Sequence, residues 1–109
     1  MRPSLPKRLS HDDQVSVVGH AQLRVSGGHG ELIVNRLPAP SAGHIYEVWL
    51  KTANGAPQPT KALFSVTSRG AADVDVPGNL RGISTVMVTQ EPSGGSLHPT
   101  SRAVIVANL

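Results

Sequence analysis

The stretch that most constrains the fold is residues 43–51, which reads GHIYEVWLK and contains the only tryptophan and the only tyrosine of the chain. The only phenylalanine, Phe64, follows soon after it, and the run 61–66 is expected to bring Leu63 and Phe64 across the core. Its β-branched and aromatic composition predicts a β-strand. Alternation along a strand would place Tyr46, Val48 and Leu50 on one face and Glu47 and Trp49 on the other. Because both faces carry large apolar groups, we expect a central strand that is covered on both sides.

The rest of the chain repeats short alternating runs, broken every eight to twelve residues by turn-forming residues, a pattern typical of all-β proteins. The expected strands span residues 14–18, 20–25, 31–37, 46–50, 61–66, 72–76, 83–90 and 103–107. Helical periodicity is absent over any useful length. The sequence therefore predicts an antiparallel Greek-key β-sandwich of about eight strands, with a small β-barrel as the alternative. Residues 14–109 form the expected single domain, and residues 1–13 form a basic, proline-containing, flexible lead-in.

Composition excludes several function classes. The chain has no cysteine, which rules out disulfides, thiolate metal sites and cysteine nucleophiles. Its net charge of +3 comes from Arg2, Lys7 and Arg8 at the start, and the remaining basic residues are scattered. A nucleic-acid binder would instead cluster lysine and arginine on one face and place aromatic residues among them. No nucleic-acid partner is therefore expected.

The sequence gives little support for a catalytic or metal site. The histidines are His11, His20, His29, His44 and His98. They fall in expected loops or at outward strand positions, so surface histidines are expected, and a histidine-based metal-binding sandwich is the alternative. Glu47 and Glu91 lie in or beside apolar strands, where each should accept hydrogen bonds from loop amides or from a basic side chain. No nucleophile motif is present, so neither an enzyme nor a cofactor is expected.

A second alternative concerns the aromatic residues. Trp49 and Tyr46 would serve as a platform for carbohydrate or a cell-wall polymer if they were exposed on a sandwich face. In a chain with so few aromatic residues, a single tryptophan more often anchors the core. We therefore expect Trp49 to be buried.

Two segments together resemble the C-terminal domain of the anti-sigma-K factor family. The first contains Leu37-Pro38, then Pro40-Ser41-Ala42-Gly43 and Tyr46-Glu47-Val48-Trp49-Leu50, followed by Leu63-Phe64. The second contains Thr89-Gln90-Glu91-Pro92, Gly94-Gly95-Ser96 and Pro99-Thr100, similar to the family's pattern T-x-E-P-x-G-G-S…P-T. The resemblance marks eight residues as structural positions, namely Tyr46, Trp49, Leu50, Phe64, Glu91, Pro92, Gly94 and Gly95. It implies no catalytic, cofactor or metal residues.

The resemblance also implies a function. Proteins of this family cross the membrane once, bind an extracytoplasmic-function sigma factor on the cytoplasmic side, and release it after regulated proteolysis. This chain would be the extracytoplasmic sensory domain. Its partners would be the rest of the membrane-anchored protein, through it a sigma factor, and a site-1-type protease. No run in the chain approaches the length of a membrane span, so we expect no direct membrane insertion by the chain itself.

Overall fold

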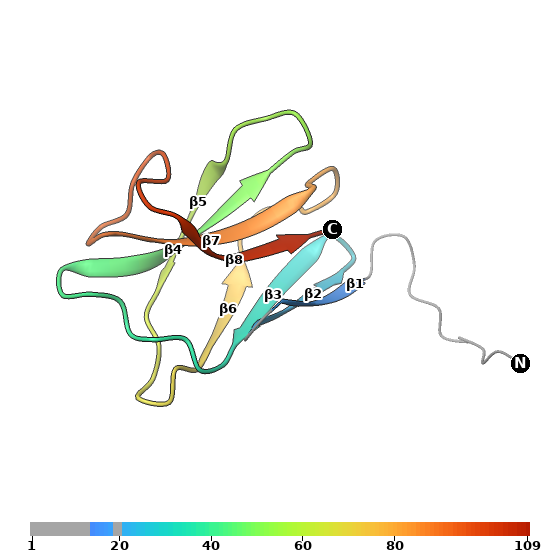
Figure 1. Cartoon of the computed structure of the whole chain (residues 1–109). Coiled ribbons are helices and arrows are strands. Elements are labelled where there is room, and N and C mark those ends of the chain that lie inside the picture. Colours follow the sequence, from blue (N-terminus) through green and yellow to red (C-terminus); the bar gives the residue numbers. More distant parts are fainter. Residues whose placement is uncertain (1–13, 19–20) are drawn as a thin grey trace, which may run out of the picture.

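The computed structural model describes residues 14–18 and 21–109, and these form two four-stranded antiparallel sheets (Figure 1). The strands are β1 (Gln14–Val18), β2 (Ala21–Ser26), β3 (His29–Val34), β4 (His44–Lys51), β5 (Gln58–Phe64), β6 (Ala72–Val76), β7 (Thr85–Pro92) and β8 (Ala103–Asn108). The expected lead-in, residues 1–13, and two of the five histidines, His11 and His20, lie outside the described residues.

The strand order is β1-β2-β3-β6 in one sheet and β5-β4-β7-β8 in the other. Strand β6 returns beside β3, and β7 returns beside β4, so the chain crosses between the sheets as it does in Greek-key sandwiches. The predicted sandwich is confirmed, and the two separate sheets replace the alternative of a closed barrel. Among the described residues, no helix is long and apolar enough to cross a membrane.

The core lies between the two sheets and is almost entirely aliphatic. Its buried residues include Leu23, Leu32 and Val34 of the first sheet and Val48 and Val88 of the second. Burial of these side chains is the main favourable contribution to folding, at about 1.5–3 kcal/mol for each large aliphatic residue.

Two aromatic residues, Tyr46 and Phe64, also belong to the core. The rings of Tyr46 and Phe64 lie 5.5 Å apart at a tilt of 32°. The Tyr46 hydroxyl donates to the carbonyl oxygen of Pro38 at 2.6 Å, which attaches the proline-rich crossing loop to β4.

Three local expectations differ from the structure. The loop expected at residues 26–30 is a two-residue turn, because Gly27 and Gly28 have φ values of 59° and 82°, the combination that a tight hairpin turn requires. Strand β5 begins at Gln58 and contains Pro59, which is tolerated because β5 is an edge strand. Leu63 was expected in the core beside Phe64, but adjacent strand residues face opposite sides, and Leu63 is 39% exposed.

A bulge in β5 shapes the surface beside β4. Glu47 pairs with Leu63, and Trp49 pairs with Pro59, so β5 has additional residues between these two positions. Lys61 lies at the centre of the bulge with a φ of 70°. The Thr60 hydroxyl stabilises the bulge, since it donates to the Val48 carbonyl and accepts from the Ala62 amide. Leu63 lies opposite Glu47 in the register, and Lys61 lines the same part of the surface as Glu47.

Candidate functional site

The second sheet is buried on both faces near the middle of β4 and β7. Tyr46 and Val48 point to the core between the sheets, so Glu47 and Trp49 occupy the opposite, outer face. On β7, Thr89 lies opposite Glu47 in the register. Trp49, Glu47, Thr89 and Glu91 are nevertheless buried, with exposed fractions of 0%, 2%, 0% and 0%. The expectation that β4 is covered on both sides is correct.

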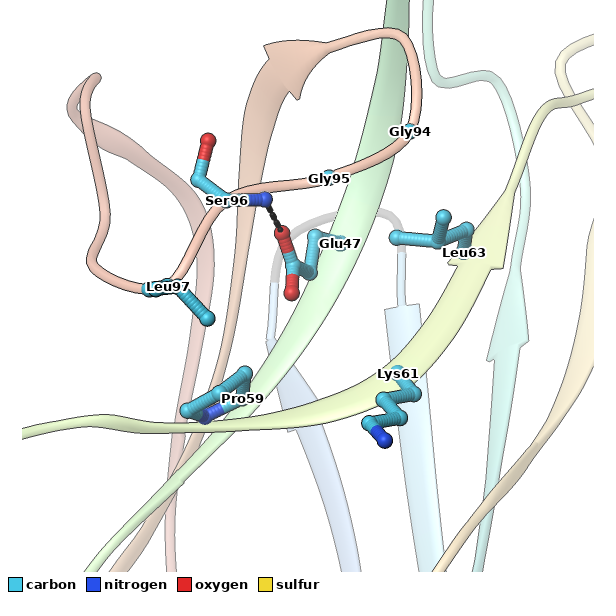
Figure 2. A pocket seen from close by; sticks show the side chains of 8 residues that line it. All are labelled: Glu47, Pro59, Lys61, Leu63, Gly94, Gly95, Ser96 and Leu97. Atoms are coloured by element: carbon cyan, nitrogen blue, oxygen red, sulfur yellow. Dashed lines mark hydrogen bonds between the residues drawn. The ribbon is translucent and has the colours of Figure 1, made fainter.

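The segment over this outer face is the β7–β8 loop, residues 93–102, seen in Figure 2 in front of β4. Hydrogen bonds to buried side chains hold it there. The Ser96 amide donates to Glu47 Oε1 at 2.8 Å, and the Thr100 amide donates to Glu91 Oε2 at 3.0 Å. The Thr100 hydroxyl also donates to Glu91 Oε1. The two carboxylates therefore receive loop amides, the kind of donor that the sequence analysis anticipated.

Thr89 connects Trp49 to this arrangement. The Trp49 Nε1–H donates to Thr89 Oγ1 at 2.8 Å, and the Thr89 hydroxyl donates to Glu91 Oε2. Glu47, Trp49, Thr89, Glu91 and their loop donors Ser96 and Thr100 are called the outer-face network below. Each polar side chain of this network is paired inside the protein, as buried polar groups require.

The two carboxyl groups of the outer-face network differ in electrostatic environment. Burial by itself raises the pKa of Glu91, but hydrogen bonds from Thr100 and Thr89 outweigh it, and the pKa is lowered overall. For Glu47, burial raises the pKa, the Ser96 amide partly opposes this, and the nearby Glu91 carboxylate raises it further. The folded state therefore favours the charged form of Glu91 and disfavours the charged form of Glu47.

Gly94 and Gly95 allow the loop to approach the sheet. Both have positive φ values, 97° and 84°, a backbone region that other residues rarely adopt. A Cβ atom on Gly95 would lie 3.1 Å from both Glu47 Oε1 and Leu63 Cδ2, whereas a Cβ on Gly94 would meet nothing within 4 Å. Gly95 is thus required for close packing as well as for its backbone conformation.

Beside the outer-face network is a hollow of about 440 Å³, bounded by β4, β5 and the β7–β8 loop (Figure 2). Its lining residues are Glu47, Pro59, Lys61, Leu63, Gly94, Gly95, Ser96 and Leu97. Glu47 lies at its base, and the exposed Leu97 and Lys61 lie at its rim. This hollow is a candidate binding site of the part of the chain that the structure describes.

The structure divides the eight residues named from the sequence into groups. Tyr46, Leu50 and Phe64 pack on the core side of the sheet. Trp49 and Glu91 belong to the outer-face network, and Gly94 and Gly95 line the hollow. Pro92 ends β7, opposite His44 in the register.

Four contributors lie outside that set of eight, namely Glu47, Thr89, Ser96 and Thr100, although Glu47 was expected to accept loop amides and the other three stand in the family pattern. The alternation of β4 is the signal that could have added Glu47, which shares a face with Trp49. Lys61 and Leu97 had no comparable signal, because the bulge and the loop path bring them to the hollow.

Neither of the two alternative functions considered from the sequence finds support among the described residues. Trp49 is 0% and Tyr46 2% exposed, so these two residues form no platform for carbohydrate. Within residues 14–18 and 21–109, no group of three or more histidine, cysteine or acidic side chains is placed to hold a metal ion. His29 lies near one acidic side chain of the described part of the chain, with Nε2 3.7 Å from Asp75 Oδ1.

Fold and site together define a small Greek-key sandwich with a glycine-containing loop held over one sheet by two buried glutamates. A family model described as "Anti-sigma-K factor rskA, C-terminal" matches residues 8–104. The chain belongs to this family of anti-sigma factors, as the resemblance predicts. Searches of curated proteins and of solved structures returned no significant match.

The family pattern now has a structural explanation. Glu91, Ser96 and Thr100, which stand in the pattern T-x-E-P-x-G-G-S…P-T, take part in the bonds between the loop and the sheet, and Thr89 of the same pattern donates to Glu91 within β7. Their partners on β4 are Glu47 and Trp49, from the first segment of the resemblance. The two segments meet at the outer face of one sheet.

Proposed function

We propose that this chain is the extracytoplasmic sensory domain of a membrane-anchored anti-sigma factor, and that it acts without catalysing a reaction. In this proposal the complete protein binds an extracytoplasmic-function sigma factor on the cytoplasmic side. Proteolysis, begun by a site-1-type protease, then releases the sigma factor. The observation that carries the proposal is the family match over residues 8–104, which covers nearly the whole chain.

The outer-face network supports a regulatory role of this kind. A regulated domain needs two states that differ in free energy by an amount that a signal can supply. A loop held by a few buried hydrogen bonds can be released locally while the aliphatic core stays intact. Glu47 and Glu91 therefore make the β7–β8 loop a natural place for a change of state.

The location can be tested with a single introduced cysteine. The chain contains no cysteine, and Ser68 is exposed in the loop between β5 and β6, so Ser68→Cys adds one reactive thiol on the surface. The complete protein, expressed from its gene, would be treated in intact cells with a thiol reagent that cannot cross the inner membrane. We expect labelling without lysis, and the unsubstituted protein controls for cysteines elsewhere in the gene product. Labelling of Ser68→Cys only after lysis would contradict the proposed location.

Control of a sigma factor requires a separate measurement. A reporter driven by the sigma factor that the complete protein binds in this proposal should be low when the complete protein is intact. We expect Thr89→Val, which weakens the outer-face network, to raise reporter output together with cleavage of the anti-sigma factor. Reporter output that stays unchanged on deletion of the whole gene would contradict a role in sigma-factor control.

A further inference from the structure

The hollow beside Glu47 has the size and the wall chemistry of a small-molecule site. Its volume of about 440 Å³ lies within the range of roughly 300–1,000 Å³ typical of ligand pockets. Pro59, Leu63 and Leu97 supply apolar walls. Leu97 is 77% exposed although it is a large aliphatic residue, and Leu63 is 39% exposed. A ligand between these two side chains would remove apolar surface from water.

Glu47 gives this hollow a polar base. Its side chain is buried, and Oε1 accepts the Ser96 amide at 2.8 Å. Among the described residues, no donor is placed to reach its second carboxylate oxygen. Figure 2 shows this oxygen directed away from Ser96, into the space bounded by Leu97, Pro59 and Lys61. A buried carboxylate oxygen that lacks a donor is costly, so a donor that enters the hollow gains a strong hydrogen bond.

A cationic donor suits this position better than a neutral one. Burial and the neighbouring Glu91 both disfavour the charged form of Glu47, and they raise its pKa. An ammonium group would supply the missing opposite charge. At the rim, Lys61 is exposed and has no ion-pair partner within the described part of the chain, so it is free to meet an anionic group.

We propose that the hollow binds a small zwitterion with an apolar body, the chemistry of an aliphatic amino acid. The ammonium group donates to the second oxygen of Glu47, the aliphatic body packs between Leu63 and Leu97, and the carboxylate lies toward Lys61. The proposal concerns binding alone and does not depend on the membrane location or on sigma-factor control.

The test is a titration of the ¹⁵N-labelled 109-residue chain, followed by amide chemical shifts, with three probes of the same branched skeleton. Leucine carries both charges, 3-methylbutan-1-amine carries only the amine, and 4-methylpentanoate carries only the carboxylate. We expect leucine to shift the amides of residues 94–97 in a saturable way and 4-methylpentanoate not to do so. The amine-only probe should bind at the same amides more weakly than leucine.

Variants locate the binding. Glu47→Gln should weaken leucine binding by about tenfold or more, because a charge-assisted hydrogen bond is lost. Asp75→Asn, a matched carboxylate-to-amide change on a side chain that is 80% exposed, should leave it unchanged. Leu97→Ala provides a second variant that leaves the core intact, and it should also weaken binding.

Three results would overturn the proposal. One is the absence of saturable shifts with leucine, which would mean that the hollow holds water only. Another is binding of 4-methylpentanoate that is as tight as the binding of leucine. The third is leucine binding that stays undiminished both in a folded Glu47→Gln variant and in the Leu97→Ala variant.

Discussion

The Thr89 hydroxyl takes part in two hydrogen bonds at once. It accepts the Trp49 Nε1–H at 2.8 Å and donates its own proton to Glu91. A threonine hydroxyl can do both, whereas the methyl group of valine can do neither. This residue, with no exposed surface, couples the only tryptophan of the chain to the carboxylate that holds the loop.

Thr89→Val tests this coupling with little change of shape. We expect a loss of about 1–3 kcal/mol in the free energy of unfolding, because the buried Trp49 N–H is left without an acceptor. Thr85→Val is the matched control, since the Thr85 hydroxyl bonds Asn108 at an exposed position. Urea unfolding followed by circular dichroism measures both variants. Equal and small losses of unfolding free energy in the two variants would show that the Thr89 hydroxyl does not stabilise the protein through the outer-face network.

The opposite pKa shifts of Glu91 and Glu47 predict that their contributions to stability change with pH in opposite directions. The folded state lowers the pKa of Glu91, so its contribution to stability is present above the ordinary value of 4.5 and is lost as pH falls through the folded value. The folded state raises the pKa of Glu47, so its contribution is present below 4.5 and is lost as pH rises through the folded value.

Glu91→Gln and Glu47→Gln separate these contributions. The stability advantage of the wild-type chain over Glu91→Gln should be largest at neutral pH and shrink in acid. Relative to Glu47→Gln, the wild-type chain should be least favoured at neutral pH and recover as pH falls. Unfolding in urea across the acid-to-neutral range gives both differences. Differences that change in the same direction would contradict the assignment of the two environments.

At the scale of elements, the sequence predicts the strands well and the loop poorly. All eight expected strands lie within about three residues of the observed ones because alternation and turn residues are local signals. The expected strands 61–66 and 31–37 differ most from the observed ones. Strand β5 begins earlier and contains a bulge at Lys61, and β3 begins earlier because the turn before it has only two residues, Gly27 and Gly28. The Ser96–Glu47 bond joins residues 49 positions apart, a distance that local patterns do not address.

The packing of the β7–β8 loop can be tested by comparing alanine substitutions at Gly94 and Gly95. Alanine at either position forces a side chain into the left-handed region, which costs roughly 1–2 kcal/mol. Gly95→Ala should cost more than Gly94→Ala, because only its Cβ would press on Glu47 and Leu63. Thermal unfolding of the two variants measures the difference. Equal losses would mean that the loop moves away from the sheet at no further cost.

For the whole molecule, the sandwich and the family follow from the sequence, because both rest on patterns distributed over the chain. The hollow does not, since it exists only where β5, β4 and the β7–β8 loop come together. The candidate site could therefore be predicted only in part: Glu47, Gly94 and Gly95 were named, and Lys61 and Leu97 were not.

The burial of Trp49 gives a global probe. As the only tryptophan, with 0% exposure, it should show blue-shifted emission and weak quenching by acrylamide in the folded chain, and lose both on unfolding. Free N-acetyltryptophanamide is the exposed reference. Emission at the wavelength of this reference in the native chain would contradict the packed outer face.

The central claim is that the two buried glutamates hold the β7–β8 loop on the sheet, and amide hydrogen exchange tests it most directly. The Ser96 and Thr100 amides lie in a loop, yet each donates to a buried carboxylate. We predict that both exchange much more slowly than the amides of Gly94 and Leu97. Glu47→Gln should speed exchange mainly at Ser96, and Glu91→Gln mainly at Thr100. Exchange of all four amides at the rate of an unstructured peptide in the native chain would contradict the claim.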